Sequence, residues 1–190
     1  RVSGFDISNR ELVFEIFIKE AQFLNDITCD DIKFLYVTDI GQNIIFRIDV
    51  VSKVYIKLLE TQTTAPNGIV YDKSNHRLLV CYFTSNASID EIELEDLSTT
   101  TLISTQYCNF DGITLDKDGN CYVSSFGTGD FQNDFKKDGA IYKFDKYFDD
   151  EPIVLLDNLH GSADIYFNII KSELAIPLFL DNEVIFKKFE

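Results

Sequence analysis

An internal repeat limits what this chain can fold into more than any other feature of its sequence. The stretch 111–125 reads as a hairpin, in which Ile113 and Leu115 alternate with polar residues and Asp118-Gly119-Asn120 supplies a tight turn. The same pattern recurs along the chain, and its aligned isoleucines are Ile27, Ile69, Ile113 and Ile165. The copies therefore begin 42 to 52 residues apart, which is typical of the blades of a β-propeller.

The repeat divides the 190 residues into consecutive units of one domain. We expect a half blade at 1–20, whole blades at about 24–61, 66–106 and 110–157, and a closing blade at 163–190. These units hold two, four, four, four and three strands, and no helix of any length is predicted. The predicted fold class is all-β, a propeller of four-stranded blades. Because a closed ring leaves no bare strand edge, we expect roughly one and a half further blades on the N-terminal side.

The charge of the chain excludes two classes of partner. A net charge of −15 argues against nucleic acids and anionic membranes, because both need a cationic face. No run of 18 apolar residues occurs, so no membrane span is expected. The acidic surface either attracts a metal cation or serves only to keep the protein soluble. The compartment stays open between the cytoplasm and the periplasm or secretion, and so does the oligomeric state.

Polar residues stand two positions before the aligned isoleucine in three of the four copies. These residues are Asn25, Asn67 and Asp111, and the fourth copy has Ala163. Because the first strands of successive blades line the channel of a propeller, we expect these side chains to converge at one mouth of that channel. Their oxygens are hard ligands that suit Ca²⁺, Mg²⁺ or Mn²⁺. The alternative is that they only cap strands and make turns.

Other residues near this mouth are further candidates. Asp26 and Asp164 follow one position later, and His160 precedes the last copy. The third unit also carries an unusually long loop at 127–138, which contains Phe131 and Phe135. This loop is either a lid over the mouth or a surface excursion.

Three short motifs resemble successive blades of a known family, the SMP-30/gluconolactonase/LRE-like family of NHL-related propellers. The motifs are Phe23-Leu24-Asn25-Asp26, Pro66-Asn67-Gly68-Ile69 and Phe110-Asp111-Gly112-Ile113. The resemblance implies a six-bladed ring in the full form, with Asn67 and Asp111 as ligands of a divalent metal. It also implies that Asn25 contacts the metal shell or the substrate, and that Asp111 is the general base. Where sugar-lactone hydrolases of the family commonly have an arginine, this chain has Phe23.

The sequence therefore predicts a metal-dependent hydrolase of lactones or esters. The expected cofactor is a divalent metal (Ca²⁺, Mg²⁺, Mn²⁺ or Zn²⁺) that activates a water molecule, with Asp111 as the base that takes its proton. The predicted metal ligands are Asn25, Asn67 and Asp111, and the predicted substrate-binding residues are Asn25, Phe23, His160 and Asp164. An apolar or aromatic lactone or ester fits Phe23 as well as a sugar does. The alternative function is a non-catalytic propeller that binds a small ligand or a protein partner.

Overall fold

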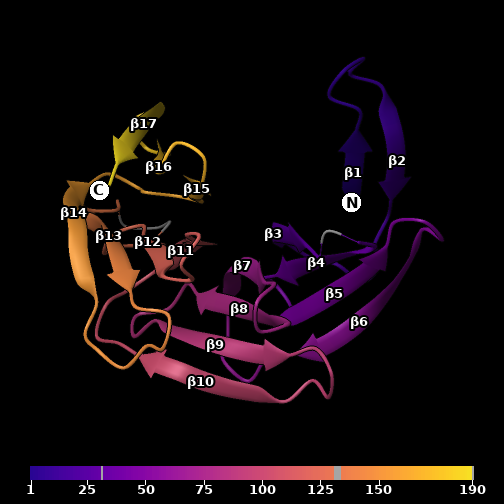
Figure 1. Ribbon diagram of the computed structural model, residues 1–190, viewed down its shortest axis with the longest axis horizontal. Coiled ribbons are helices and arrows are strands. Elements are labelled where there is room, and N and C mark those ends of the chain that lie inside the picture. Colours follow the sequence, from indigo (N-terminus) through magenta and orange to yellow (C-terminus); the bar gives the residue numbers. More distant parts are fainter. Residues whose placement is uncertain (31, 131–133, 190) are drawn as a thin grey trace.

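The computed structural model describes residues 1–30, 32–130 and 134–189, and within these ranges all regular structure is β-strand. The strands form five antiparallel sheets of two, four, four, four and three strands, as the repeat predicts. Figure 1 shows the sheets arranged radially as an arc, with β1 and β2 at one end of the arc and β15 to β17 at the other. The fold is therefore an all-β propeller of four-stranded blades whose ring is not closed by the described residues.

Each sheet is built from strands that follow one another along the chain. The first sheet contains β1 (Val2–Phe5) and β2 (Leu12–Ile16), and the second contains β3 (Leu24–Cys29), β4 (Phe34–Asp39), β5 (Ile44–Asp49) and β6 (Val54–Glu60). The third contains β7 (Pro66–Asp72), β8 (Arg77–Tyr82), β9 (Ser88–Glu93) and β10 (Thr99–Ser104). The fourth contains β11 (Phe110–Leu115), β12 (Cys121–Ser125), β13 (Gly139–Phe144) and β14 (Ile153–Leu159). The last contains β15 (Tyr166–Asn168), β16 (Glu173–Leu178) and β17 (Glu183–Lys188).

The hydrophobic core is divided into four clusters, one between each pair of neighbouring sheets. In order along the arc, they are built around Ile16, Val37 and Phe46; Tyr36, Ile45 and Leu78; Leu79, Phe110 and Val123; and Ile141, Ile165 and Leu174. Leu78 and Leu79 are consecutive yet belong to different clusters, because successive side chains of a strand point to opposite faces of its sheet. A blade with a neighbour on both faces therefore needs the nearly continuous apolar run seen in β8.

The first strand of each blade, which we call the inner strand, lies at the centre of the arc (Figure 1). The inner strands are β3, β7, β11 and β15, and each is an edge strand of its sheet. An unpaired edge leaves backbone N–H groups without partners, and side chains of the preceding inner strand satisfy several of them here. The Ile69 N–H donates to Asp26 Oδ2 at 2.7 Å, and the Phe167 N–H donates to Thr114 Oγ1 at 3.2 Å.

β15 is shorter than the strand expected from residue 163, because the Ser162–Leu178 pair is only an isolated bridge, separated from the regular ladder. Ala163 donates its N–H to the carbonyl of Pro177 at 3.0 Å, but Pro177 has no N–H to return the bond. Regular pairing begins only at Tyr166, opposite Ala175. Residues 163 and 164 therefore form the irregular entry to the last blade.

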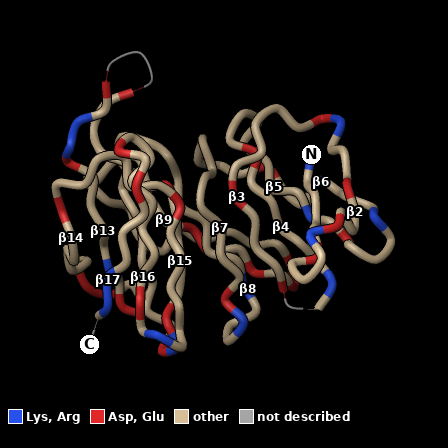
Figure 2. The backbone as a smooth tube through the Cα atoms, turned by 90° about the horizontal axis from the view of Figure 1, so that it is seen from above, with Lys and Arg blue, Asp and Glu red and all other residues tan. Residues whose placement is uncertain are grey.

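Many acidic residues close turns. Figure 2, which is turned by 90° from Figure 1, shows the strands running between two faces on which the turns gather, with Asp and Glu at several of these turns. Asp30, Asp72 and Asp116 follow or end successive inner strands and accept backbone N–H bonds from the turn that follows. Part of the net charge of −15 is thus a consequence of the repeated turn. None of the described residues forms a helix long and apolar enough to cross a membrane.

Candidate functional site

A β-bulge interrupts three of the inner strands at the same point of the repeat. The pairing register shifts between Leu24 and Ile27, between Pro66 and Ile69, and between Phe110 and Ile113. The residues inside the bulges are Asn25 and Asp26, Asn67 and Gly68, and Asp111 and Gly112. A bulge bends its strand and redirects a side chain, which is why bulges often lie beside functional sites. The three bulges and residues 163 and 164 mark one end of the channel, which we call the channel mouth.

Glycine in the second and third bulges lets successive inner strands approach closely. A Cβ atom on Gly68 would lie 2.5 Å from the carbonyl oxygen of Asp111, and one on Gly112 would lie 2.4 Å from the backbone nitrogen of Ile165. Neither position has room for a side chain. The glycines thereby allow Asn67 and Asp111, each the residue before a glycine, to lie side by side at the mouth.

Asn67 and Asp111 form a polar pair, in which Asn67 is buried and Asp111 is half-buried. The Asn67 Nδ2 group donates to Asp111 Oδ2 at 3.5 Å, which is a long contact. Only 2% of Asn67 is exposed, and its Oδ1 atom is buried without a hydrogen-bond partner. Burial, together with the charge of Asp164, raises the pKa of Asp111 to about 7. The pair thus presents one unsatisfied amide oxygen and one poorly solvated carboxylate.

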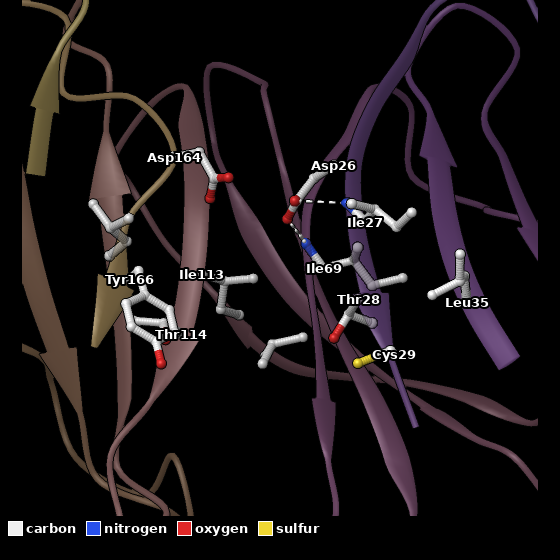
Figure 3. A pocket seen from close by; sticks show the side chains of 12 residues that line it. Asp26, Ile27, Thr28, Cys29, Leu35, Ile69, Ile113, Thr114, Asp164 and Tyr166 are labelled. Carbon is white, nitrogen blue, oxygen red and sulfur yellow. Dashed lines mark hydrogen bonds between the residues drawn. The ribbon is translucent and has the colours of Figure 1, made fainter. Parts of the chain in front are cut away.

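Two further carboxylates face each other across the channel. Figure 3 shows Asp26 on β3 and Asp164 before β15 on opposite walls of a cavity of about 420 Å³. Asp26 accepts the N–H groups of Ile69 at 2.7 Å and of Ile27 at 2.6 Å. Burial and then the charge of Asp164 raise the pKa of Asp26, and these two hydrogen bonds oppose that shift. Burial also raises the pKa of Asp164.

Part of the wall of this cavity was not singled out from the sequence. The residue directly after each aligned isoleucine lines the cavity in every copy, and these residues are Thr28, Val70, Thr114 and Tyr166. The repeat itself contains the signal, because residues at equivalent positions of successive inner strands surround one channel. Apolar surface dominates the walls, while Asp26 and Asp164 supply the charges.

The other predicted site residues lie around the same end of the channel without joining the polar pair through a described bond. Asn25 is exposed in the first bulge. Phe23 is 59% exposed, and its N–H donates to Asp39 Oδ1 at 3.0 Å. His160 Nδ1 lies 2.7 Å from Asp181 Oδ1 in the turn between β16 and β17, so this nitrogen is engaged. Over the described part of the chain, no three His, Cys, Asp or Glu side chains are placed to hold one metal ion.

Comparison with known proteins supports the β-propeller fold. No family model and no curated protein matches the chain. Many solved structures match it, and in each of the three described here the chain overlaps only part of the other protein. A chain of a nidogen/laminin complex aligns with a TM-score of 0.77 and 17% identity, over 90% of this chain and 64% of that one. A gluconolactonase from Xanthomonas campestris aligns with a TM-score of 0.74 and 15% identity, over 90% of this chain and 59% of that one. Hydrazine synthase from Kuenenia stuttgartiensis aligns with a TM-score of 0.73 and 16% identity, over 92% of this chain and 48% of that one.

These matches bear on the fold alone. The chain spans between about half and just under two thirds of the length of the three solved chains. The three proteins have different functions by their titles, and propellers host many functions. The finding is therefore that the chain has a β-propeller fold.

Proposed function

We propose that the chain belongs to a metal-dependent hydrolase that cleaves lactones or esters at the channel mouth. The observation that carries the proposal is the Asn67–Asp111 pair, in which a buried amide oxygen lacks a partner beside a carboxylate with little solvation. A buried polar atom without a partner is unfavourable, so such an atom in a native fold calls for an explanation. The structural similarity to a gluconolactonase is consistent with this function.

The residues present fit a divalent cation in their chemistry. Asn67 Oδ1 and the Asp111 carboxylate are hard oxygen donors, and a cation between them would satisfy the first and neutralise the second. Asn67 and Asp111 would hold the ion, and Asn25 and Asp164 remain predicted members of the same site. When bound, a divalent ion would supply polarisation of the substrate carbonyl and a lowered pKa for a water molecule.

The chain's own residues would perform the remaining steps. Asp111 accepts the proton of the attacking water through one carboxylate oxygen. Asp26 is fixed by the Ile69 N–H and thereby keeps the first and second whole blades at a constant separation. The apolar walls formed by Val70 and Ile113 limit the access of bulk water from within the channel.

A second candidate function is a propeller that binds a small ligand or a protein partner without catalysis. One observation favours it, namely that a chain of a nidogen/laminin complex, an assembly of proteins by its title, has a similar fold. The hydrolase and the binding protein would both use a polar mouth above a partly apolar channel. They differ in whether the bound molecule is hydrolysed.

Replacing Asp111 with Asn tests the proposal, since the change keeps the shape and one oxygen donor but removes the charge and the basicity. Activity is measured on a panel of lactones and aryl esters, with and without Mg²⁺, Ca²⁺, Mn²⁺ and Zn²⁺. We expect hydrolysis to fall by at least ~10²-fold, the effect typical of losing a general base. The control is Asp118→Asn, which removes a carboxylate from an exposed turn. Metal-independent activity, or full activity in Asp111→Asn, contradicts the mechanism, and absence of turnover across the panel supports the binding function.

A further inference from the structure

One residue in each blade holds a fixed place at the channel mouth, directly after the second strand. The four residues are Ile40, Phe83, Phe126 and Phe179, and each donates its backbone N–H to a carbonyl at the start of its own blade. The accepting residues are Phe23, Ala65, Asn109 and Gly161, at distances of 3.0, 2.9, 2.9 and 2.8 Å. Each acceptor stands two residues before Asn25, Asn67, Asp111 or Ala163. The repeat therefore places phenylalanine at this same position in three successive blades.

The three phenylalanines form a continuous aromatic cluster, which we call the aromatic rim. The ring centres of Phe83 and Phe126 are 5.9 Å apart, and those of Phe126 and Phe179 are 6.0 Å apart. Phe126 is 4% exposed and forms the base of the rim, whereas Phe179 is 64% exposed. An exposed phenylalanine that is continuous with a buried aromatic cluster offers a ring face for a further aromatic group.

The long loop of the third blade packs on the rim. The Phe135 ring centre lies 4.7 Å from that of Phe126 and 6.2 Å from that of Phe83. The loop is held in place by the Asp138 carboxylate, which accepts the Thr128 N–H at 2.7 Å, and by Asn109, whose Nδ2 group donates to the Gly127 carbonyl at 2.8 Å. Phe131 lies outside the described residues. The Phe135 ring is 8% exposed, so this end of the loop adds to the buried part of the aromatic rim.

We propose that the aromatic rim binds the aromatic, non-reacting part of the substrate, so that the enzyme acts on aromatic lactones and aryl esters in preference to sugar lactones. This inference rests on the proposed function, because it assigns the substrate class of that site. A sugar needs hydrogen-bonding side chains around its hydroxyl groups, and the three rings of the rim supply none. Phe179 gains contact and loses exposed apolar surface when a flat ring covers it.

Binding is tested without turnover by using lactams, which resemble lactones but resist hydrolysis. The chain contains no Trp, so Phe179→Trp provides a single fluorescent reporter at the rim. We expect 3,4-dihydroquinolin-2-one, an aromatic lactam, to change this fluorescence in a saturable way and to bind at least tenfold more tightly than gluconolactam. The same ligands are titrated against the unmodified chain by calorimetry, because the reporter itself alters the rim.

Two substitutions separate the rim from apolar surface elsewhere. Phe179→Ala is expected to weaken binding of the aromatic lactam roughly three- to tenfold, in line with the contribution of one aromatic contact. Phe186→Ala is the matched control, because Phe186 is 62% exposed on β17 and lies outside the rim. Phe83→Leu, which keeps the apolar volume, is expected to weaken binding less than Phe179→Ala.

The results distinguish this inference from the proposed function. Rim-dependent lactam binding without hydrolysis of the matching lactone supports the aromatic ligand and contradicts the hydrolase. Hydrolysis of gluconolactone that is unaffected by Phe179→Ala supports the hydrolase and overturns the aromatic substrate class. Equal binding of the two lactams, or equal effects of Phe179→Ala and Phe186→Ala, also overturns the inference.

Discussion

The hydroxyl group of Thr38 donates to the backbone carbonyl of Asn67 at 2.7 Å, and so ties the second strand of one blade to the bulge of the next. The same oxygen accepts the N–H of Asp26 at 3.0 Å. Ser124 repeats the arrangement later in the chain, because its Oγ donates to the Ala163 carbonyl at 2.7 Å and accepts the Gly112 N–H at 2.8 Å. Buried hydroxyl groups of the second strands therefore connect two of the bulges to the equivalent residues of the next blade.

Thr38→Val should be clearly destabilising. Valine has nearly the same shape, but it leaves the Asn67 carbonyl and the Asp26 N–H without this partner in a fully buried place. We expect the free energy of unfolding to fall by about 1–3 kcal/mol, as measured by urea denaturation. The control is Thr101→Val at an exposed position of β10. A loss no larger than that of the control contradicts a role for this bond.

Gly112→Ala should disturb both the fold and the mouth. The added methyl group would lie 2.4 Å from the Ile165 nitrogen and 2.6 Å from the Asp164 Cα atom, and both of these are backbone atoms. We expect a loss of about 1–3 kcal/mol from overpacking, read from the unfolding midpoint. Gly41→Ala is the control, because its added Cβ would meet only side-chain atoms, at 3.0 Å or more. Equal stability of the two variants would show that the inner strands can separate without loss.

Most of the architecture could be predicted from the sequence because it follows from periodicity. The repeat of alternating apolar residues around Ile27, Ile69 and Ile113 predicted sheets of two, four, four, four and three strands, and the structure confirms this series. The turn at Asp118-Gly119-Asn120 was also predicted, and Gly119 adopts a φ of +86° there. These features depend on local chemistry and on a pattern that is repeated several times.

The site was less predictable because its details depend on contacts between blades. The sequence places Asn25 and Asp26 side by side, but only the bulge register and the neighbouring blade explain why Asp26 binds the Ile69 N–H while Asn25 stays exposed. Likewise, Asp111 and Asp116 belong to the same copy of the repeat, yet Asp116 accepts the N–H groups of a turn and Asp111 contacts Asn67. Whether an aspartate closes a turn or lines a channel is decided by its distance along the inner strand.

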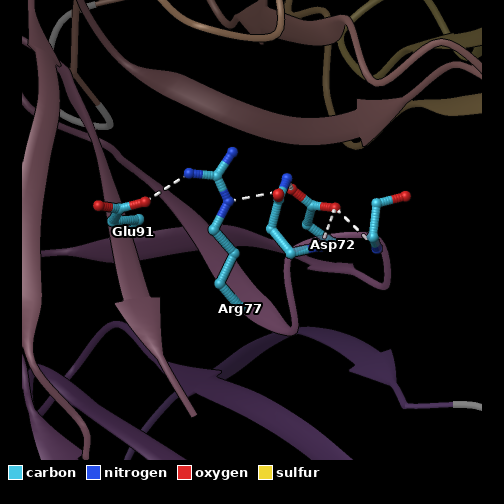
Figure 4. Close-up of polar contacts among 5 residues, drawn as sticks. Asp72, Arg77 and Glu91 are labelled. Atoms are coloured by element: carbon cyan, nitrogen blue, oxygen red, sulfur yellow. Dashed lines mark hydrogen bonds and ion pairs between the residues drawn. The ribbon is translucent and has the colours of Figure 1, made fainter. Parts of the chain in front are cut away.

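An ion network in the second whole blade gives a test of buried charge. Figure 4 shows Arg77 between Asp72 and Glu91, with its Nε 2.9 Å from Asp72 Oδ2 and its Nη1 bound to Glu91 Oε2. Arg77→Met leaves two poorly exposed carboxylates without their cation, so we expect a loss of about 3 kcal/mol in unfolding free energy. Lys117→Met is the control, since the Lys117–Asp118 pair is solvent-exposed and should contribute less than about 1 kcal/mol. Adding Glu91→Leu to Arg77→Met should recover part of the loss, and failure to do so would argue against stranded charge as the cause.

Acid should remove a contribution to stability that comes from Asp49. The Lys33 ammonium lies 2.7 Å from this carboxylate and, with the N–H groups of the following turn, lowers the pKa of Asp49 to about 2. Because the folded pKa lies below the unfolded value of about 4, the contribution is complete above pH 4 and disappears as the pH falls towards 2. We therefore expect Asp49→Asn to be less stable than the unmodified chain at pH 6, and the difference to vanish near pH 2. The midpoints of urea unfolding between pH 2 and pH 6 measure this difference in stability. Asp157→Asn is the control for removing one exposed charge. A difference between Asp49→Asn and the unmodified chain that does not change with pH would contradict the assignment.

The unsatisfied oxygen of Asn67 gives a test of metal binding. If this atom is a metal ligand, a divalent cation should raise the unfolding temperature of the unmodified chain by mass action, and EDTA should reverse the rise. Asn67→Leu keeps the branched shape of the side chain but removes the oxygen ligand, so the cation-dependent rise should be lost. Without the cation, the variant should be about as stable as the unmodified chain, because leucine removes a buried polar atom that had no partner and gives up only the 3.5 Å contact with Asp111. Asn86→Leu, at an exposed position, is the control and should keep the full response to the cation. A cation response that survives in Asn67→Leu would place the ion elsewhere, and a marked loss of stability in that variant without cation would show instead that the Asn67 amide is required for the fold.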